Sequence, residues 1–442
     1  DAKACYDRVI PYVTLYMLYR LGMPIHLGQF MCNVLKQTKY TIKTGSGNTE
    51  AYSSQDARLF GTGQGAGWSP PCWAANSDVI SCVMERYTPG MLLEHPNRAH
   101  ISHRHIDAFV DDSSLGTTRT AYDQFNPPQE APVPKGESLY EQARLNTQFY
   151  SRLLFTTGGQ LAIHKCMAYI LIFVWINGTR KLKSVKQEYP PMRIQQGINQ
   201  TEDFIRIQDP DEAFRMLGGF VAPDGNTRVQ VEVLYKKAKQ WGLRLTYSHL
   251  NEHEAWVAYH QVLIPSLIYP LGAIPVSEED CIKIMGPALN ALLPKLGLSP
   301  TTARELIHGP TRYGAPAITN IYTEAGGARI KMFIGHWRKD DETANILRIS
   351  MGCCQQEVGI GPGLLEHDFR KYGWILQPCW VKELWRFLDD INGKIIIDDD
   401  WTQTRCSNDE FLMRIVHDMA LSKDQIRKIN LCRLYKRVTF LS

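Results

Sequence analysis

Two adjacent carboxylates, Asp111 and Asp112, follow the apolar and aromatic run of "HIDAFVDDSS" (residues 105–114). Such a run predicts a β-strand that leads into the two aspartates. Two like charges side by side are unfavourable unless a cation, a basic group or water compensates them. An isolated pair is most often a solvated turn or a helix cap, and "KIIIDDDWT" (394–402) has the same pattern without the accompanying motifs.

A third carboxylate, Asp1, opens the segment "DAKACYD" (1–7). If Asp1 also ends a strand, it can face Asp111 and Asp112 from a neighbouring strand. Three oxygen ligands of this kind suit Mg²⁺. Two such ions about 4 Å apart stabilise the attacking and leaving oxygens of a phosphoryl transfer. The residues therefore predict a site for two Mg²⁺ ions, with Mn²⁺ as the alternative, and chemistry on a nucleotide.

A glycine-rich loop, "GTGQGAGWSPP" (61–71), lies between these carboxylates in the sequence. It lacks the Gly-Lys-Ser/Thr ending of an ATPase loop, and its glycine spacing does not fit a dinucleotide fingerprint. The Gln64 amide can both donate and accept hydrogen bonds, and Gly65 lets the backbone approach a flat partner such as a base pair.

The elements that must position these residues follow from the apolar pattern and the turn signals. We expect a helix over 5–24, a hairpin with its turn at 45–47, a helix beginning at Ser69-Pro70-Pro71, a helix over about 139–155, one buried strand over 166–176 that turns back at Asn177-Gly178, and mostly helices beyond about 240. A proline-rich insertion (126–138) precedes the second long helix.

Composition limits the possible partners and the cellular compartment of the chain. The net charge of +4, from 49 Lys+Arg against 45 Asp+Glu, permits a nucleic-acid partner without requiring one. The odd number of 11 cysteines, without a C-x-x-C pair, favours a reduced, intracellular compartment, cytoplasmic or nuclear. No signal peptide or transmembrane segment is visible, and no membrane partner is expected. The chain begins with Asp inside a motif, so we expect a fragment.

The remaining clusters of charged or titratable residues do not by themselves indicate a metal site or a phosphate-binding site. His100, His103 and His105 lack a Cys or acidic partner at metal-ligand spacing, which predicts a polar surface loop. The basic run 180–186 is as typical of a solvated strand face as of a phosphate-binding surface, and the basic run 423–438 is more typical of a solvated helix.

The motifs occur in a known order. "DAKACYD", "GTGQGAGWSPP", "AFVDD" (108–112), "GGQLAIHKC" (158–166) and "MLGG" (216–219) resemble the successive palm motifs of reverse transcriptases, most closely those of non-LTR retrotransposons. By this resemblance Asp1, Asp111 and Asp112 are the catalytic, metal-binding carboxylates. Phe109 takes the aromatic place of the family's Y-x-D-D box.

The resemblance also assigns six residues to nucleotide and primer. They are Tyr6 against the sugar of the incoming nucleotide, Gln64 and Gly65 against the nascent base pair, Lys165 near the triphosphate, and Leu217 with Gly218 in the primer grip. The implied substrates are an RNA template, a DNA primer and deoxynucleoside triphosphates.

The implied fold is α+β. Residues 1–240 would form a palm, truncated at its N-terminus and without fingers, with a three- or four-stranded antiparallel sheet and helices. Residues 241–345 would form a helical, thumb- or connection-like region, and 346–442 a C-terminal extension without an assigned role. The implied function is RNA-directed DNA synthesis. Two alternatives stay open: an inactive, nucleic-acid-binding remnant of such a polymerase, and a different metal-dependent phosphotransferase that needs no template.

Overall fold

The chain is mixed α+β and divides into two compact units. The structure is a computed structural model, which describes residues 2, 5–51, 53, 61–62, 66–120, 135–176, 179–361, 363–398, 406 and 409–441. Unit 1 comprises Asp1–Leu92, His103–Ile172 and Lys183–Asp209, and unit 2 comprises Leu93–Ser102, Phe173–Leu182 and Pro210–Ser442. No helix in these ranges is both long and apolar enough to cross a lipid bilayer.

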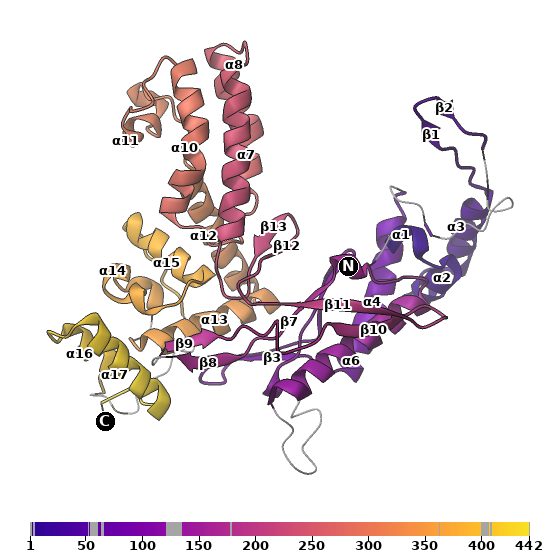
Figure 1. Cartoon of the computed structure of the whole chain (residues 1–442), viewed down its shortest axis with the longest axis horizontal. Helices are drawn as coiled ribbons and strands as arrows, with labels where there is room; N and C mark the ends of the chain where they lie inside the picture. The colour runs from indigo at the N-terminus through magenta and orange to yellow at the C-terminus, as the bar shows by residue number, and fades with distance from the viewer. Residues whose placement is uncertain are drawn as a thin grey trace. The chain divides into compact units, whose positions relative to one another are not determined.

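Unit 1 carries the N-terminal helices and most of the short strands (Figure 1). Its elements are α1 (Cys5–Arg8), α2 (Pro11–Arg20), α3 (Ile25–Gln37), β1 (Lys43–Thr44), β2 (Gly47–Asn48), α4 (Ser69–Tyr87), β5 (Ile106–Phe109), β6 (Asp112–Leu115), α6 (Lys135–Thr156), the 3₁₀ helix η1 (Ile163–Lys165), β7 (Met167–Tyr169), β10 (Met192–Gln196) and β11 (Thr201–Gln208). β3 (Met91–Glu94) and β4 (Ile101–Arg104) pair with each other and are divided between the units.

The sheets of unit 1 are small. β1–β2 and β5–β6 are antiparallel hairpins, and β10, β11 and β7 form a three-stranded sheet in which β7 runs parallel to β11. One antiparallel sheet of three or four strands, as expected from the sequence, is not formed by the described residues. α6 holds the edge of this sheet, because the Gln148 side chain both donates to and accepts from the backbone of Gln195, at 2.9 and 2.7 Å.

Two elements expected from the sequence are interrupted. The helix over 5–24 is broken after Arg8, because Pro11 lacks a backbone N–H and begins the new helix α2 instead. The run 166–176 forms two strands, β7 and β8 (Phe173–Ile176), rather than one buried strand. Trp175 in β8 is 62% exposed, so this strand does not lie in a core. The hairpin expected after it is confirmed, since β8 pairs antiparallel with β9 (Thr179–Leu182).

Unit 2 is largely helical. Besides β8 and β9 it contains β12 (Phe214–Met216), β13 (Gly219–Val221), α7 (Arg228–Thr246), α8 (Glu252–Ala258), the π-helix η2 (Tyr259–Leu263), α9 (Ile264–Ile268), α10 (Glu278–Lys295), α11 (Arg304–Ile307), η3 (Thr311–Tyr313), α12 (Ile321–Lys339), α13 (Glu342–Val358), η4 (Leu364–Glu366), α14 (Phe369–Tyr372), η5 (Gly373–Ile375), α15 (Trp380–Asp390), α16 (Leu412–Asp418) and α17 (Lys423–Lys436). The expected boundaries at 240/241 and 345/346 fall inside α7 and α13.

The main core of unit 2 lies between α7, α10 and α12. α7 and α10 run side by side (Figure 1), and Gly242 permits the close approach, because a Cβ there would lie 2.7 Å from the carbonyl oxygen of Pro287. Leu234, Ile284 and Leu292 are among the fully buried side chains that fill this interface. Burial of this apolar surface is the dominant stabilising contribution to such a helical pair.

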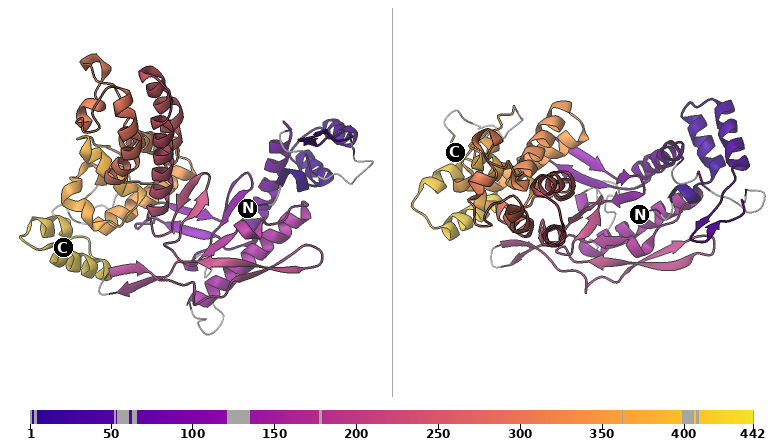
Figure 2. Two further views of the ribbon diagram at one scale, coloured as in Figure 1. Left: turned by 45° about the horizontal axis from the view of Figure 1, so that its top comes forward. Right: turned by 90° about the horizontal axis from the view of Figure 1, so that it is seen from above.

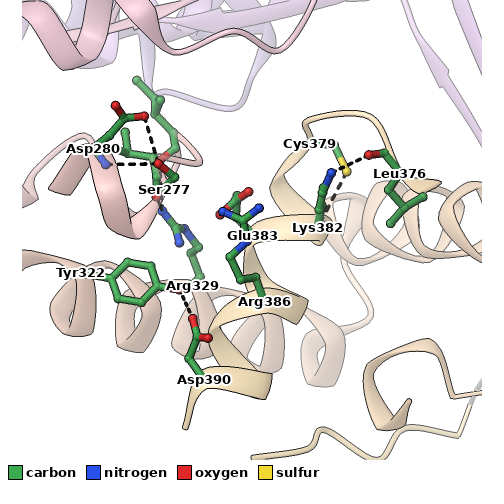
Figure 3. A network of polar contacts seen from close by, with 12 residues as sticks. Ser277, Asp280, Tyr322, Arg329, Leu376, Cys379, Lys382, Glu383, Arg386 and Asp390 are labelled. Atoms are coloured by element: carbon green, nitrogen blue, oxygen red, sulfur yellow. Dashed lines mark hydrogen bonds and ion pairs between the residues drawn. The ribbon is translucent and has the colours of Figure 1, made fainter. Parts of the chain in front are cut away.

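A buried polar network crosses α12 and α15 (Figure 3). The Arg329 guanidinium is fully buried and donates only long hydrogen bonds, of 3.4 and 3.3 Å, to the carbonyls of Ile274 and Val276. Its Nε and Nη1 have no hydrogen-bond partner in the described part of the chain. Burial raises the pKa of Glu383 and lowers the pKa of Arg329. Glu383 is the main compensating charge for Arg329, whereas the Glu383 carboxylate is compensated first by Arg386, 3.5 Å away, and then by Arg329.

Two neighbouring glycines of α12 provide a matched test of this packing. A Cβ at Gly326 would overlap the ring of Phe387, whereas a Cβ at Gly327 would meet nothing within 4 Å. We expect Gly326→Ala to lower the free energy of unfolding by about 1–3 kcal/mol, since an overpacked core is strained. Gly327→Ala should raise it by about 0.5–1 kcal/mol, because alanine favours a helix interior. Urea unfolding measures both, and equal effects of the two substitutions would contradict the packing.

Candidate functional site

The two adjacent aspartates lie at a tight hairpin in unit 1. Phe109 of β5 pairs directly with Asp112 of β6, so Val110 and Asp111 form a two-residue turn. The strand therefore ends before the aspartates, not at them: Asp111 lies in the turn and Asp112 begins the returning strand. Both side chains are partly exposed, and neither forms an ion pair with any residue that the structure describes.

Val110 holds this turn in an unfavourable conformation. Its φ of 56° lies in the left-handed region, which a β-branched residue rarely adopts. Asp111 is not among the residues with positive φ, so Val110 alone holds the left-handed conformation in this turn, at a position where hairpins favour glycine, asparagine or aspartate. Strain of this kind costs roughly 1–3 kcal/mol and persists only where surrounding contacts enforce it.

Hydrogen bonds from two distant segments enforce the turn. The indole Nε1 of Trp73 in α4 donates to the carbonyl oxygen of Val110 at 2.5 Å. The backbone N–H of Ala2 donates to the carbonyl oxygen of Asp111 at 3.0 Å. Trp73 and Ala2 are themselves buried, and Ala2 also forms an antiparallel bridge with Leu161. Both carbonyls of the turn are thus fixed from outside the hairpin.

A third contact fixes the strand that follows the turn. The Ser113 hydroxyl donates to the Tyr150 hydroxyl of α6 at 2.9 Å. Tyr150 belongs to the core cluster that also contains Ala2, Trp73 and Leu161, and burial raises the pKa of its phenol. Trp73 and Tyr150 position the site, although neither belongs to a motif of the sequence. No local signal reveals them, because their partners lie 37 residues away in each case.

Three of the expected site residues, Asp1, Gln64 and Gly65, lie outside the described residues. For Asp1, the nearest described position is Ala2, whose N–H bonds to Asp111. The described start of the glycine-rich loop packs against α1: Thr62 donates its backbone N–H to the Tyr6 carbonyl at 2.8 Å. Gly61, with φ of 91°, lies so close to α1 that a Cβ would strike the backbone of Asp7.

The other expected residues of unit 1 are described. Tyr6 is half-buried and packs against the core cluster of Trp73 and Tyr150. Phe109 is 61% exposed at the end of β5, next to the turn. Lys165 is exposed at the end of η1, immediately before β7. The structure therefore brings Ala2, Tyr6, Asp111 and their supporting residues around one core cluster.

Leu217 and Gly218 form the turn of another hairpin, which belongs to unit 2. Both residues have positive φ, of 48° and 87°, as a two-residue turn between β12 and β13 requires. The Tyr269 hydroxyl donates to the Leu217 carbonyl at 3.1 Å and its ring lies against Gly218. Asp398, in the second acidic run of the sequence, also belongs to unit 2, while Asp399 and Asp400 lie outside the described residues.

The expected loop is formed only in part. His100 and His105 lie outside the strands, directly before and directly after β4, whereas His103 lies within β4. The rings of His103 and His105 have centroids 4.4 Å apart. His103 Nε2 lies 2.6 Å from the carbonyl oxygen of Pro89. Burial and the neighbouring His103 lower the pKa of His105. Across the described ranges, no group of three or more His, Cys, Asp or Glu side chains is arranged to hold a metal ion.

Glycine should relieve the strain at Val110. We expect Val110→Gly to change the free energy of unfolding by less than about 1 kcal/mol, because the relieved strain offsets the backbone entropy and the lost side chain. Ala108→Gly, two residues earlier in regular β5, has no strain to relieve and should cost about 0.5–1 kcal/mol. Urea unfolding compares them, and a loss above about 2 kcal/mol for Val110→Gly would show that the turn is not strained.

Comparison with known proteins does not assign the chain to a family. No protein-family model matches the chain, and no curated protein matches its sequence. The geometry around the β5–β6 turn, together with the order of the motifs, is therefore the basis for any functional conclusion.

Proposed function

We propose that this chain is a reverse transcriptase of the non-LTR retrotransposon type, which copies an RNA template into DNA. The observation that carries the proposal is the strained β5–β6 turn that contains Asp111. The Asp111 carbonyl accepts a hydrogen bond from Ala2, which directly follows Asp1 in the sequence. A conformation that costs energy and is enforced by buried contacts is typical of functional sites. The order of the five motifs in the sequence supports the same conclusion.

Asp111 and Asp112 have the chemistry that Mg²⁺ prefers. They offer only oxygen ligands, they are partly exposed, and no described cation compensates them. Asp1 would supply the third carboxylate. When bound there, two Mg²⁺ or Mn²⁺ ions would neutralise charge on the phosphates of the nucleotide.

The reaction would join a DNA primer to a deoxynucleoside triphosphate. The 3′-hydroxyl of the primer attacks the α-phosphate, and pyrophosphate leaves. The protein contributes position and charge rather than covalent chemistry. In this proposal Tyr6 lies against the sugar, Lys165 near the triphosphate, and Gln64 and Gly65 against the new base pair.

The two units would then take the parts of a polymerase. Unit 1 would be the palm, and the helices around α7 and α10 would be the thumb. The turn at Leu217 and Gly218, held by Tyr269, would grip the primer. The role of the segment from α13 to α17 is not assigned by this proposal.

The first test replaces one metal ligand. We expect Asp111→Asn to lower the rate of extension of an oligo(dT) primer on a poly(A) RNA template by about a hundredfold or more, because an amide is a poor substitute for an anionic Mg²⁺ ligand. Asp398→Asn, in the second acidic run, is the matched control and should extend at the wild-type rate.

Three outcomes would contradict this proposal. Substantial residual extension by Asp111→Asn would show that the aspartate pair is structural. No extension by the wild-type chain would favour an inactive remnant. Nucleotide transfer that ignores the template would favour a different phosphotransferase.

The second test concerns the sugar of the incoming nucleotide. If the Tyr6 ring lies beneath the ribose, a 2′-hydroxyl would collide with it. Tyr6→Ala should then raise incorporation of ribonucleotides relative to deoxynucleotides by about tenfold or more. Tyr6→Phe keeps the ring and should keep the discrimination. A parallel loss of both incorporations in Tyr6→Ala would mean that Tyr6 only packs against the core, as its partial burial also permits.

A further inference from the structure

The segment from Arg8 to Thr49 contains no carboxylate, although 45 of the 442 residues of the chain are Asp or Glu. It contains five cations, Arg8, Arg20, Lys36, Lys39 and Lys43. The segment forms α2, α3 and the β1–β2 hairpin, all within unit 1. An uninterrupted excess of positive charge over successive elements is the electrostatic signature of a surface for a polyanion.

Three tyrosines form a strip along α2. Tyr12, Tyr16 and Tyr19 are 57%, 65% and 51% exposed. Their spacing of four and three residues places them on one face of the helix. We call these three residues the tyrosine strip.

The orientation of the strip is fixed by the opposite face of α2. Thr14 is buried there and accepts a hydrogen bond of 2.7 Å from the Asn76 side chain of α4. α3 lies beside α2 (Figure 2), and the close approach needs Gly28, since a Cβ there would strike the Leu15 side chain. The strip is therefore held outward by packing on two sides.

Cations lie beside the tyrosine strip and on the elements that follow it in the same segment. The Lys36 ammonium of α3 lies 5.4 Å from the centre of the Tyr12 ring. Arg20 at the end of α2, Lys39 after α3, and Lys43 in β1 are all exposed. Phe30 of α3, 62% exposed, adds a fourth aromatic ring to the same helical pair. Rings interleaved with cations can hold both the bases and the phosphates of a nucleic acid.

We propose that α2, α3 and the β1–β2 hairpin form a binding surface for single-stranded nucleic acid, with bases stacked on the tyrosine strip and phosphates bound by the cations of the same segment. Successive rings of the strip rise by about 4.5–6 Å along the helix axis. This exceeds the rise of about 3.4 Å per nucleotide along the axis of a duplex. The strip therefore suits an extended strand whose bases are unpaired. That this strand is the RNA template rests on the proposed function, whereas the binding itself does not.

A protein partner is the competing occupant, because tyrosine is also enriched in protein interfaces. The absence of carboxylates decides between the two here. A protein surface would ordinarily offer both signs of charge to its partner, whereas this segment offers cations and rings only.

Removal of the rings tests the proposal. The probe is a fluorescein-labelled oligo(U) RNA of about 20 nucleotides, long enough to cover a typical single-strand site. The full chain is titrated against it by fluorescence anisotropy. Tyr16→Ala/Tyr19→Ala should weaken binding by about tenfold or more, since two stacking rings are lost. Tyr16→Phe/Tyr19→Phe keeps the rings and should bind like the wild type.

Tyr435→Ala is the control, because this tyrosine is 83% exposed on α17 of unit 2, a helix to which the proposed function assigns no role. It should leave the affinity unchanged. A blunt RNA duplex of the same length should bind the wild type and Tyr16→Ala/Tyr19→Ala equally, because paired bases cannot reach the strip.

Removal of cations provides an independent readout. Lys39→Ala/Lys43→Ala should reduce the slope of log affinity against log salt concentration by about 1.4, the contribution of two phosphates of a single strand. If an alanine variant fails to fold, ultraviolet crosslinking of the wild type to an oligo(U) that carries 4-thiouridine decides instead, and peptides from residues 9–43 should be modified.

Two results would overturn the proposal. The first is an affinity of Tyr16→Ala/Tyr19→Ala for the single strand that equals the wild-type affinity. If this variant also self-associates less than the wild type, the tyrosine strip binds a second copy of the chain and not a nucleic acid. The second is crosslinking confined to other segments. Asp111→Asn should keep the single-strand affinity even where it abolishes extension, so a failure of this proposal can be told from a failure of the proposed function.

Discussion

The two hydrogen bonds that fix the carbonyls of Val110 and Asp111 are the constraint on which the proposed catalytic site depends. A β-branched residue at positive φ would relax unless its surroundings held it. Trp73 holds it from α4, and Ala2 holds it from the start of the chain. The same core cluster contains Tyr150 of α6, which contacts the returning strand. Contacts from three segments far apart in the sequence therefore stabilise the same turn conformation.

The supporting residues are aromatic or small and buried, whereas the chemistry-bearing residues are polar and partly exposed. This division has a physical reason. The carboxylates of Asp111 and Asp112 need solvent or a cation to compensate their charge, whereas the hydrogen bonds that position the turn are strongest where water does not compete for the same donors and acceptors. The N-terminal helices follow the opposite rule, since α2 exposes its aromatic side chains. Exposed rings next to cations are stable in water but leave apolar surface for a ligand to cover.

The core of unit 2 combines apolar packing with a buried charge. This helical core contains the fully buried Arg329, whose guanidinium donates two long hydrogen bonds to described residues, with Glu383 as the nearby opposite charge. Buried charges of this kind contribute little net stability but penalise any arrangement that separates them. The network therefore restricts how α12 and α15 can pack, and so does the close approach of Gly326 to Phe387, which leaves no room for a Cβ.

The sequence by itself determined the local elements: the start of α4 at Ser69, the β1–β2 hairpin and the hairpin after Ile176 follow from proline, glycine and short-range patterns. It also predicted that Asp111 and Asp112 follow a strand. Only the tertiary structure decided that Val110 has positive φ, that Trp73 supports it, and that the tyrosines of α2 face outward. These features depend on partners distant in the sequence, and apolar periodicity predicts a helix without showing which face the rest of the chain covers.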